Sequence, residues 1–281
     1  MLAIVGAGVM GTGLAALAVG HGHDVVLIEP DPAALATAAE RVAGQVRLAR
    51  LCGAFPRGTR TGTLAVERRV DALRAVPVDA VLESVVERPD VKRAVLADVA
   101  AAVPGGTLLG STTSAIPVDE LASATGRPGD VVGLHFMNPP YRIRAVEVVR
   151  GARTGEHTMR RTMALLDGLG ARAVEVGDGP GFVVNRILQR MINEAARIVE
   201  EGRCSPAAVD AALTECLGHR TGPLATADLI GLDNVADSLR VLHERTGDDG
   251  YRPCAALLAK VAAGDLGRKT GRGFYEYGER R

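Results

Sequence analysis

The sequence predicts an α/β protein in which a doubly wound sheet is followed by an all-α C-terminal domain. Short apolar strand patterns alternate with helical patterns up to about residue 177, which is typical of a sheet covered by helices on both faces. Beyond that point only helical patterns follow, to about residue 264. A Gly/Pro-rich turn near residue 180 separates the two parts, so we expect one domain over 1–180 and a second over 181–281.

The expected strands are short and mostly apolar, as strands buried between two helical layers are. They lie at residues 2–5, 24–29, 80–85, 107–112, 131–136, 145–150 and 172–177. Helical patterns stand between several of them, at residues 12–23, 30–50, 89–103 and 154–170. The helical patterns of the C-terminal part cover residues 183–202, 205–218, 227–247 and 253–264.

The composition is that of an ordinary globular protein. The chain has 281 residues, a formal net charge of zero and 47% hydrophobic residues, enough for a substantial core. The neutral balance argues against binding to nucleic acid or to a membrane surface. No apolar run reaches the roughly 18–20 residues that span a bilayer. Because the four cysteines are scattered, a disulfide framework or zinc site is disfavoured, and we expect a cytoplasmic protein without a metal.

A glycine-rich turn, "GAGVMG", joins the first strand to the first helix. In such a motif the first glycine makes the tight turn, the second lets the backbone approach a pyrophosphate, and the third lets helix and strand pack closely. Glu29 ends the next strand, where its carboxylate would bind a ribose 2′-hydroxyl and repel a 2′-phosphate. The motif therefore predicts a Rossmann-type site that prefers NAD. Its expected contacts in the turn are Gly6, Gly8, Val9, Met10 and Gly11.

His135 raises the question whether it is a packed core residue or a base. It lies in the apolar strand pattern "VVGLHF", and Glu147 lies in the similar pattern "AVEVV". Burying Glu147 alone would be expensive, so the pattern calls for a cation or a hydrogen-bond donor beside it. An imidazole titrates near neutral pH and can take the proton of an alcohol while a hydride leaves. From these residues alone, both interpretations of His135 stay open.

Several stretches together resemble the 3-hydroxyacyl-CoA dehydrogenase family, in the family's order and close to its spacing. They cover nearly the whole chain, and only residues 44–75 match poorly. The stretches are "GAGVMGTGLA", "VVERPDVKRAVLADV", "STTSAIPVDEL", "GLHFMNPP", "GDGPGFVVNRIL", "GPLATADLIGLDN" and "LGRKTGRGFYEY".

The resemblance implies an NAD-dependent enzyme that oxidises a hydroxyl group of a thioester-bound acyl chain, and a helical domain that usually dimerises. The family's catalytic histidine falls on His135 and its glutamate partner on Glu147. Its two supporting residues fall on Ser114 and Asn185. Further cofactor contacts fall on Glu87, Lys92, Asn138 and Lys269. We therefore expect a homodimer in which His135 acts as the base and Glu147 orients it.

On the substrate side the chain departs from the family's usual pattern. Polar residues follow "HFMNP" and precede "GPLATAD", where relatives usually carry apolar ones. A pocket lined by hydrogen-bonding groups discriminates against ligands that leave those groups unpaired, so we expect a short polar acyl group. The expected substrate contacts are Ser114, Tyr141, Arg142 and Arg220.

The stretch "HRTGPLATADLIGLDN" resembles a sub-branch of the family that serves polyketide biosynthesis. This resemblance implies a glyceryl group on an acyl carrier protein, oxidised on the way to hydroxymalonyl or methoxymalonyl extender units, and we take this as the first expectation for the substrate. The competing substrate is a short-chain 3-hydroxyacyl-CoA such as 3-hydroxybutyryl-CoA, so the partner is an acyl carrier protein or a CoA thioester. Oxidation of a free polar hydroxy acid also stays open, as does a protein that binds NAD without catalysis.

Overall fold

The computed structural model describes residues 1–56 and 58–278. In it the chain forms two compact units, Met1–Phe182 and Val183–Arg281, each with an apolar core of its own. The first unit contains every strand among the described residues, and the second is helical. This is the α/β sheet followed by a helical domain that the sequence predicts.

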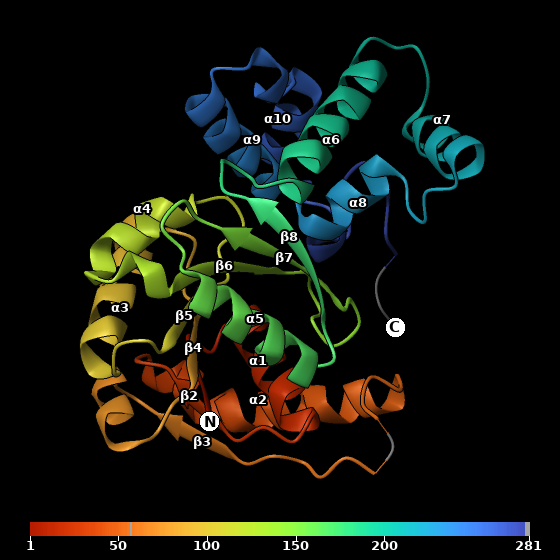
Figure 1. The fold of residues 1–281 in the computed structure, drawn as a ribbon. Helices are drawn as coiled ribbons and strands as arrows, with labels where there is room; N and C mark the ends of the chain where they lie inside the picture. The colour runs from red at the N-terminus through yellow and green to blue at the C-terminus, as the bar shows by residue number, and fades with distance from the viewer. Residues whose placement is uncertain (57, 279–281) are drawn as a thin grey trace. The chain divides into compact units, whose positions relative to one another are not determined.

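One eight-stranded sheet runs through the first unit, in the order β3-β2-β1-β4-β5-β6-β7-β8 (Figure 1). The strands from β3 to β6 are parallel, β7 is antiparallel to β6, and β8 is parallel to β7. The strands are β1 Leu2–Val5, β2 Val25–Ile28, β3 Leu64–Glu67, β4 Ala80–Glu83, β5 Leu108–Ser111, β6 Val131–Phe136, β7 Ala145–Arg150 and β8 Arg172–Gly177.

The expected strands are all present, with ends that differ by two residues at most, and β3 is an addition. Its residues alternate between partly buried and exposed, because β3 lies at the edge of the sheet and pairs only with β2. A four-residue strand with half of its side chains in solvent leaves no apolar run in the sequence. This is why residues 64–67 gave no strand signal.

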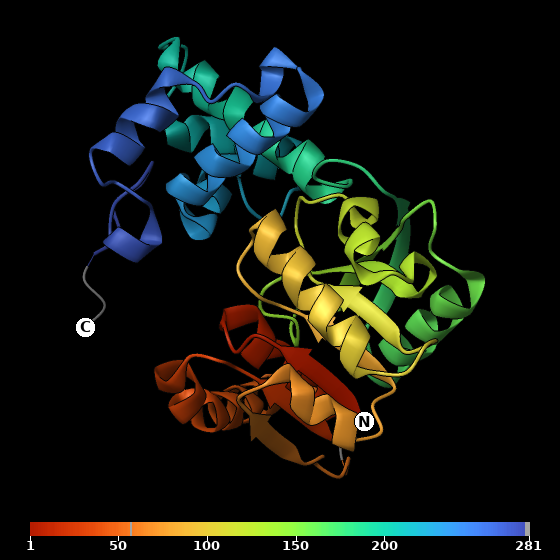
Figure 2. The ribbon, with the colours of Figure 1, turned by 90° about the vertical axis from the view of Figure 1, so that its left-hand side faces the viewer.

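Helices cover both faces of the sheet (Figures 1 and 2). In β1, Leu2 and Ile4 pack with one group of helices, while the alternate residues Ala3 and Val5 pack on the other face, as the two-residue period of a strand requires. On the Leu2 face lie α1 Val9–Gly20, α2 Pro32–Leu51 and α5 Glu156–Gly168. On the other face lie α3 Pro89–Ala102 and α4 Val118–Ala122.

The second unit is a cluster of helices around an apolar core. Its helices are α6 Val184–Glu200, α7 Pro206–Ala211, α8 Pro223–Ile230, α9 Leu232–Thr246 and α10 Ala255–Ala262. The single helix expected over 227–247 is wrong, because Gly231 adopts a φ of +100° and divides it into α8 and α9. No helix among the described residues is long and apolar enough to cross a membrane.

Asp228 holds the C-terminal segment of this unit in place. It is 1% exposed and accepts hydrogen bonds from the backbone amides of Phe274 (2.9 Å) and Tyr275 (3.0 Å) and from the hydroxyl of Tyr277 (3.0 Å). The Tyr275 hydroxyl donates to Asp210 at 2.7 Å. Burial and this carboxylate raise the pKa of Tyr275. The aromatic residues of "GFYEY" therefore serve packing and hydrogen bonding within the unit.

We predict that Asp228→Asn destabilises the second unit. The amide nitrogen of asparagine is a donor and cannot accept the hydrogen bonds that one carboxylate oxygen of Asp228 now accepts. Because buried donors would then lack an acceptor, the free energy of unfolding should fall by about 2 kcal/mol. Urea denaturation followed by circular dichroism measures the change. Asp237→Asn is the control, since the Asp237 side chain is 73% exposed and its loss should change stability by less than about 0.5 kcal/mol. Equal stability of the two variants would contradict the role of Asp228.

Candidate active site

The glycine-rich turn has the geometry of a phosphate-binding turn. Gly6 has a φ of +104°, and a Cβ there would lie 2.5 Å from the carbonyl oxygen of Ser84. At Gly11 a Cβ would lie 1.8 Å from the carbonyl oxygen of Gly6, so only glycine allows α1 to pack so close to β1. By contrast, a Cβ on Gly8 would meet nothing within 4 Å. The backbone at Gly8 is therefore open to a ligand, directly before the N-terminus of α1.

Glu29 lies beside this turn at the end of β2. Its Oε2 accepts a hydrogen bond from the amide of Ala7 at 2.8 Å, and its Oε1 accepts one from the amide of Asp31 at 3.0 Å. Arg41 of α2 donates to the carbonyl of Ala7 at 2.8 Å. Sequence reasoning missed Arg41, because no glycine motif specifies a residue on the second helix. These residues fit a dinucleotide, with amides for phosphates and a carboxylate for a ribose.

His135 and Glu147 lie directly opposite each other in the antiparallel pair of β6 and β7. The His135 Nδ1 and the Glu147 Oε2 are 2.6 Å apart, and the two side chains are 7% and 5% exposed. The pair occupies Nδ1, which leaves Nε2 as the nitrogen that can exchange a proton with a substrate. The buried histidine thus has the carboxylate partner that the burial of Glu147 calls for, as the arrangement of a base would require.

Ser114 lies in the turn after β5, and Glu87 gathers that turn around its carboxylate. The Glu87 Oε1 accepts hydrogen bonds from the Thr113 hydroxyl (2.6 Å), the Ser114 amide (2.8 Å) and the Ala115 amide (3.2 Å). Burial acts to raise the pKa of Glu87, but the Lys92 ammonium and the bonds from Thr113 and Ser114 outweigh it, so the pKa lies below its usual range. Glu87 is thus an anion that shapes the Ser114 turn.

Lys92, which we expected to contact the cofactor, is buried inside the first unit. Its side chain is 1% exposed, and its ammonium has protein acceptors in Glu83 (2.8 Å), Glu87 (3.2 Å) and the carbonyl of Val85 (3.3 Å). An ammonium has three protons, so none is left for a direct bond to a cofactor.

Tyr141 differs from its expected place in a substrate pocket. Its ring is 6% exposed and belongs to the apolar core of the first unit, together with Phe136 and Leu17. The neighbouring Arg142 is exposed in the turn between β6 and β7, and Asn138 is exposed at the end of β6. A tyrosine beside polar residues in the sequence suggests a polar surface, although here its ring completes the core. The expectation that Tyr141 lines a substrate pocket is therefore wrong, because its side chain is buried in the core.

The remaining expected residues lie on the second unit. Asn185 is the second residue of α6, and Arg220 is exposed in the loop before α8. Lys269 is 44% exposed and pairs with Asp233 at 2.5 Å. Burial acts to raise the pKa of Asp233, but the hydrogen bond and charge of Lys269, together with hydrogen bonds from backbone amides, outweigh it and lower the pKa.

In the first unit, topology gathers the predicted residues at one edge of the sheet. Strands β2, β1, β4, β5 and β6 are parallel neighbours, so the segments that follow them meet at their carboxyl ends. These segments carry Glu29, the glycine turn, Glu87, Ser114 and Asn138, and His135 lies near the end of β6. This edge is the candidate active site of the unit.

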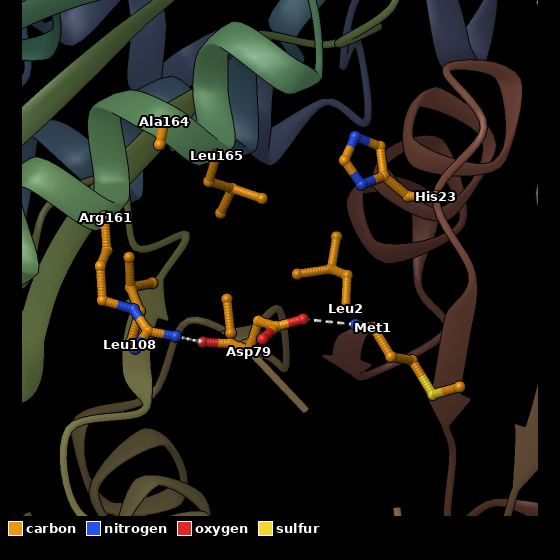
Figure 3. A pocket seen from close by; sticks show the side chains of 9 residues that line it. Met1, Leu2, His23, Asp79, Leu108, Arg161, Ala164 and Leu165 are labelled. Atoms are coloured by element: carbon orange, nitrogen blue, oxygen red, sulfur yellow. Dashed lines mark hydrogen bonds and ion pairs between the residues drawn. The ribbon is translucent and has the colours of Figure 1, made fainter. Parts of the chain in front are cut away.

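A cavity of about 290 Å³ lies at the opposite end of the strands (Figure 3). Its lining includes Leu2 and Leu108, the first residues of β1 and β5. Its charged groups are paired within the protein: the Met1 ammonium binds Asp79 at 2.5 Å, and Arg161 donates to the Asp79 carbonyl at 2.6 Å. Since the lining contains none of the expected catalytic residues, this cavity is not the candidate active site.

Comparison with known proteins identifies the family. The family model for the 3-hydroxyacyl-CoA dehydrogenase NAD binding domain matches residues 1–179, and the model for the C-terminal domain of that family matches residues 181–277. A probable 3-hydroxybutyryl-CoA dehydrogenase from Bacillus subtilis is 41% identical over 281 residues, covering 99% of this chain and 97% of the relative. A 3-hydroxybutyryl-CoA dehydrogenase from Bradyrhizobium diazoefficiens is 39% identical, covering 98% and 94%.

Solved structures agree in fold. The crystal structure of (S)-3-hydroxybutyryl-CoA dehydrogenase PaaH1 from Ralstonia eutropha has a TM-score of 0.90 and 36% identity, and the match covers 99% of each chain. That of FadB2 from M. tuberculosis has a TM-score of 0.91 and 34% identity, covering 98% of each chain. With a matching NAD-binding domain and relatives similar over almost their whole length, the chain belongs to the 3-hydroxyacyl-CoA dehydrogenase family, as an NAD-dependent oxidoreductase that acts on a CH–OH group.

Proposed function

We propose that the protein interconverts a short-chain 3-hydroxyacyl-CoA, such as 3-hydroxybutyryl-CoA, and its 3-oxo product. The observation that carries this proposal is the buried His135–Glu147 pair at 2.6 Å, which supplies an oriented proton acceptor at the carboxyl edge of the sheet. The names of the relatives described above, which refer to hydroxybutyryl-CoA, support the choice of substrate.

In this mechanism His135 moves the proton. The Glu147 carboxylate accepts a hydrogen bond from the Nδ1–H group, which fixes the tautomer and leaves the Nε2 lone pair for the substrate hydroxyl. Bound NAD supplies the hydride acceptor. As the alcohol becomes a carbonyl, Nε2 takes the hydroxyl proton, and the resulting imidazolium is stabilised by Glu147. In the opposite direction the same nitrogen returns the proton.

The remaining expected residues take supporting roles in the proposal. Ser114 and Asn185 hydrogen-bond the reacting oxygen. The amides of the glycine turn hold the cofactor phosphates, and Glu29 binds a ribose hydroxyl and disfavours a 2′-phosphate. Glu87, Asn138 and Lys269 make further cofactor contacts. The second unit joins two copies into a homodimer, which its exposed apolar side chains Ile187, Leu217 and Leu229 support.

A glyceryl group on an acyl carrier protein is the second candidate substrate. Arg142 and Arg220 are both exposed and could meet the acidic face of such a carrier. Tyr141, which we also expected to contact such a polar substrate, gives no support because it lies in the core. The relatives described above are named for CoA substrates, so the CoA thioester takes first place.

We predict that His135→Gln lowers kcat by about a thousand-fold, because glutamine cannot take the hydroxyl proton. The dissociation constant of NADH should change less than about three-fold, since the substitution removes no proposed cofactor contact. Stopped-flow kinetics and NADH fluorescence titration measure the two quantities. His157→Gln is the control: His157 also pairs with a carboxylate, Asp130 at 2.9 Å, but lies outside the site, so kcat should stay unchanged. Full activity of the His135 variant would refute the proposed base.

We predict a kcat/KM at least about ten-fold higher for 3-hydroxybutyryl-CoA than for glyceryl-acyl carrier protein, because kcat/KM expresses discrimination between substrates. The absorbance of the reduced nicotinamide follows NADH formation. The control is acetyl-CoA, which has no hydroxyl group to oxidise. The opposite preference would replace the CoA proposal by the carrier-protein one, and Arg142→Ala and Arg220→Ala would then be expected to raise KM for the carrier.

A further inference from the structure

We infer that Glu83 is a positioning residue, which acts through Lys92 and Glu87 to fix the turn that carries Ser114. The inference rests on the proposed function, because it takes Ser114 as the residue that hydrogen-bonds the reacting oxygen. The proposed mechanism gives Glu83 no task. Its side chain is 0% exposed, and a carboxylate is costly to bury unless charges and donors compensate it.

Each oxygen of Glu83 has a donor. Its Oε1 accepts from the Lys92 ammonium (2.8 Å) and from the amide of Val85 (2.8 Å). Its Oε2 accepts from the hydroxyl of Ser111 (2.6 Å), the last residue of β5. Glu83 therefore ties the ends of β4 and β5 together and anchors the first part of α3, where Lys92 lies.

The ammonium of Lys92 extends this anchor to Glu87 at 3.2 Å, and Glu87 binds the turn after β5. One oxygen of Glu87 accepts from the amide of Ser114 (2.8 Å) and the hydroxyl of Ser114 (3.3 Å). The chain of contacts thus runs from a fully buried carboxylate to a side chain that is 40% exposed and to the proposed substrate donor. Glu83 and Lys92 are thus buried, while Glu87 and the Ser114 turn lie at the surface.

The position of Lys92 between Glu83 and Glu87 follows from their charges. Glu83 and Glu87 are two carboxylates that attract the same ammonium. Lys92 therefore stays between them and pairs with both. If Glu83 loses its charge, Lys92 is free to move toward Glu87 and pull it from the Ser114 turn. If Lys92 is also removed, Glu87 loses its ion pair and is no longer tied to Glu83. In both cases the Ser114 hydroxyl loses its fixed position.

The test is a double-mutant cycle of Glu83→Gln with Ser114→Ala, measured as kcat for 3-hydroxybutyryl-CoA oxidation. In the wild-type background Glu83→Gln should lower kcat at least about ten-fold. In the Ser114→Ala background it should lower kcat less than about two-fold, because the group it positions is already gone. An equal loss in both backgrounds, or no loss in either, overturns the inference.

Glu83→Gln leaves Lys92 with one anion fewer, so a second variant guards against misfolding. Glu83→Gln/Lys92→Met removes both buried charges with side chains of similar size, and it should fold while still losing kcat at least about ten-fold. Wild-type activity of this folded double variant overturns the inference. The control is Asp130→Asn, a buried carboxylate that binds the amide of Gly106 (3.0 Å) before β6 begins, which should reduce stability without changing kcat.

The design separates the two levels of the proposal. If Ser114→Ala alone keeps full activity, the proposed role of Ser114 fails and the inference fails with it. If Ser114→Ala loses activity but neither Glu83 variant does, only the inference fails and the proposed function stands.

Discussion

The antiparallel pairing of β6 with β7 is the constraint on which the rest of the site depends. In an otherwise parallel run of strands, this reversal places His135 directly across from Glu147. The pairing also solves a physical problem for both residues, since neither a buried carboxylate nor a buried imidazole nitrogen is stable without a partner. A shift of the register by one residue would turn both side chains to the other face. The geometry of the His135–Glu147 pair is therefore set by the sheet.

The parallel part of the sheet contributes a different kind of order. Its carboxyl ends bring the backbone amides of the glycine turn, the Glu29 carboxylate and the Ser114 turn to one edge, although they are far apart in the sequence. Close approach of the backbone at Gly6 and Gly11 keeps α1 tight against β1, while Gly8 stays open. Around Glu87, four hydrogen bonds from one short turn reach a single carboxylate oxygen. The positions of the glycine turn and the Ser114 turn are thus fixed by several short contacts.

Much of this arrangement could be predicted from the sequence. The strand ends and the division into a sheet and a helical part follow from apolar periodicity, which responds to burial. The edge strand β3 and the break at Gly231 could not, because half-exposed strands and single glycines give weak local signals. Motif resemblance pointed to His135, Glu147 and Ser114. It gave no indication of Glu83, whose side-chain donors Lys92 and Ser111 lie on a helix and on a neighbouring strand. The prediction for Tyr141 was wrong for a related reason. Its place in the sequence does not show whether its ring points into the core or into a pocket.

The separation between β6 and the turn that follows it has a consequence for how such an enzyme can diversify. The ladder from Gly133↔Val149 to Phe136↔Val146 fixes the His135–Glu147 pair, while the segment between the two strands carries Asn138 and the exposed Arg142 without setting the register. Residues in that connection can change in size, charge or number while the pair keeps its place, as surface connections on a rigid sheet commonly do. Substrate preference can therefore drift over generations while the chemistry is inherited intact.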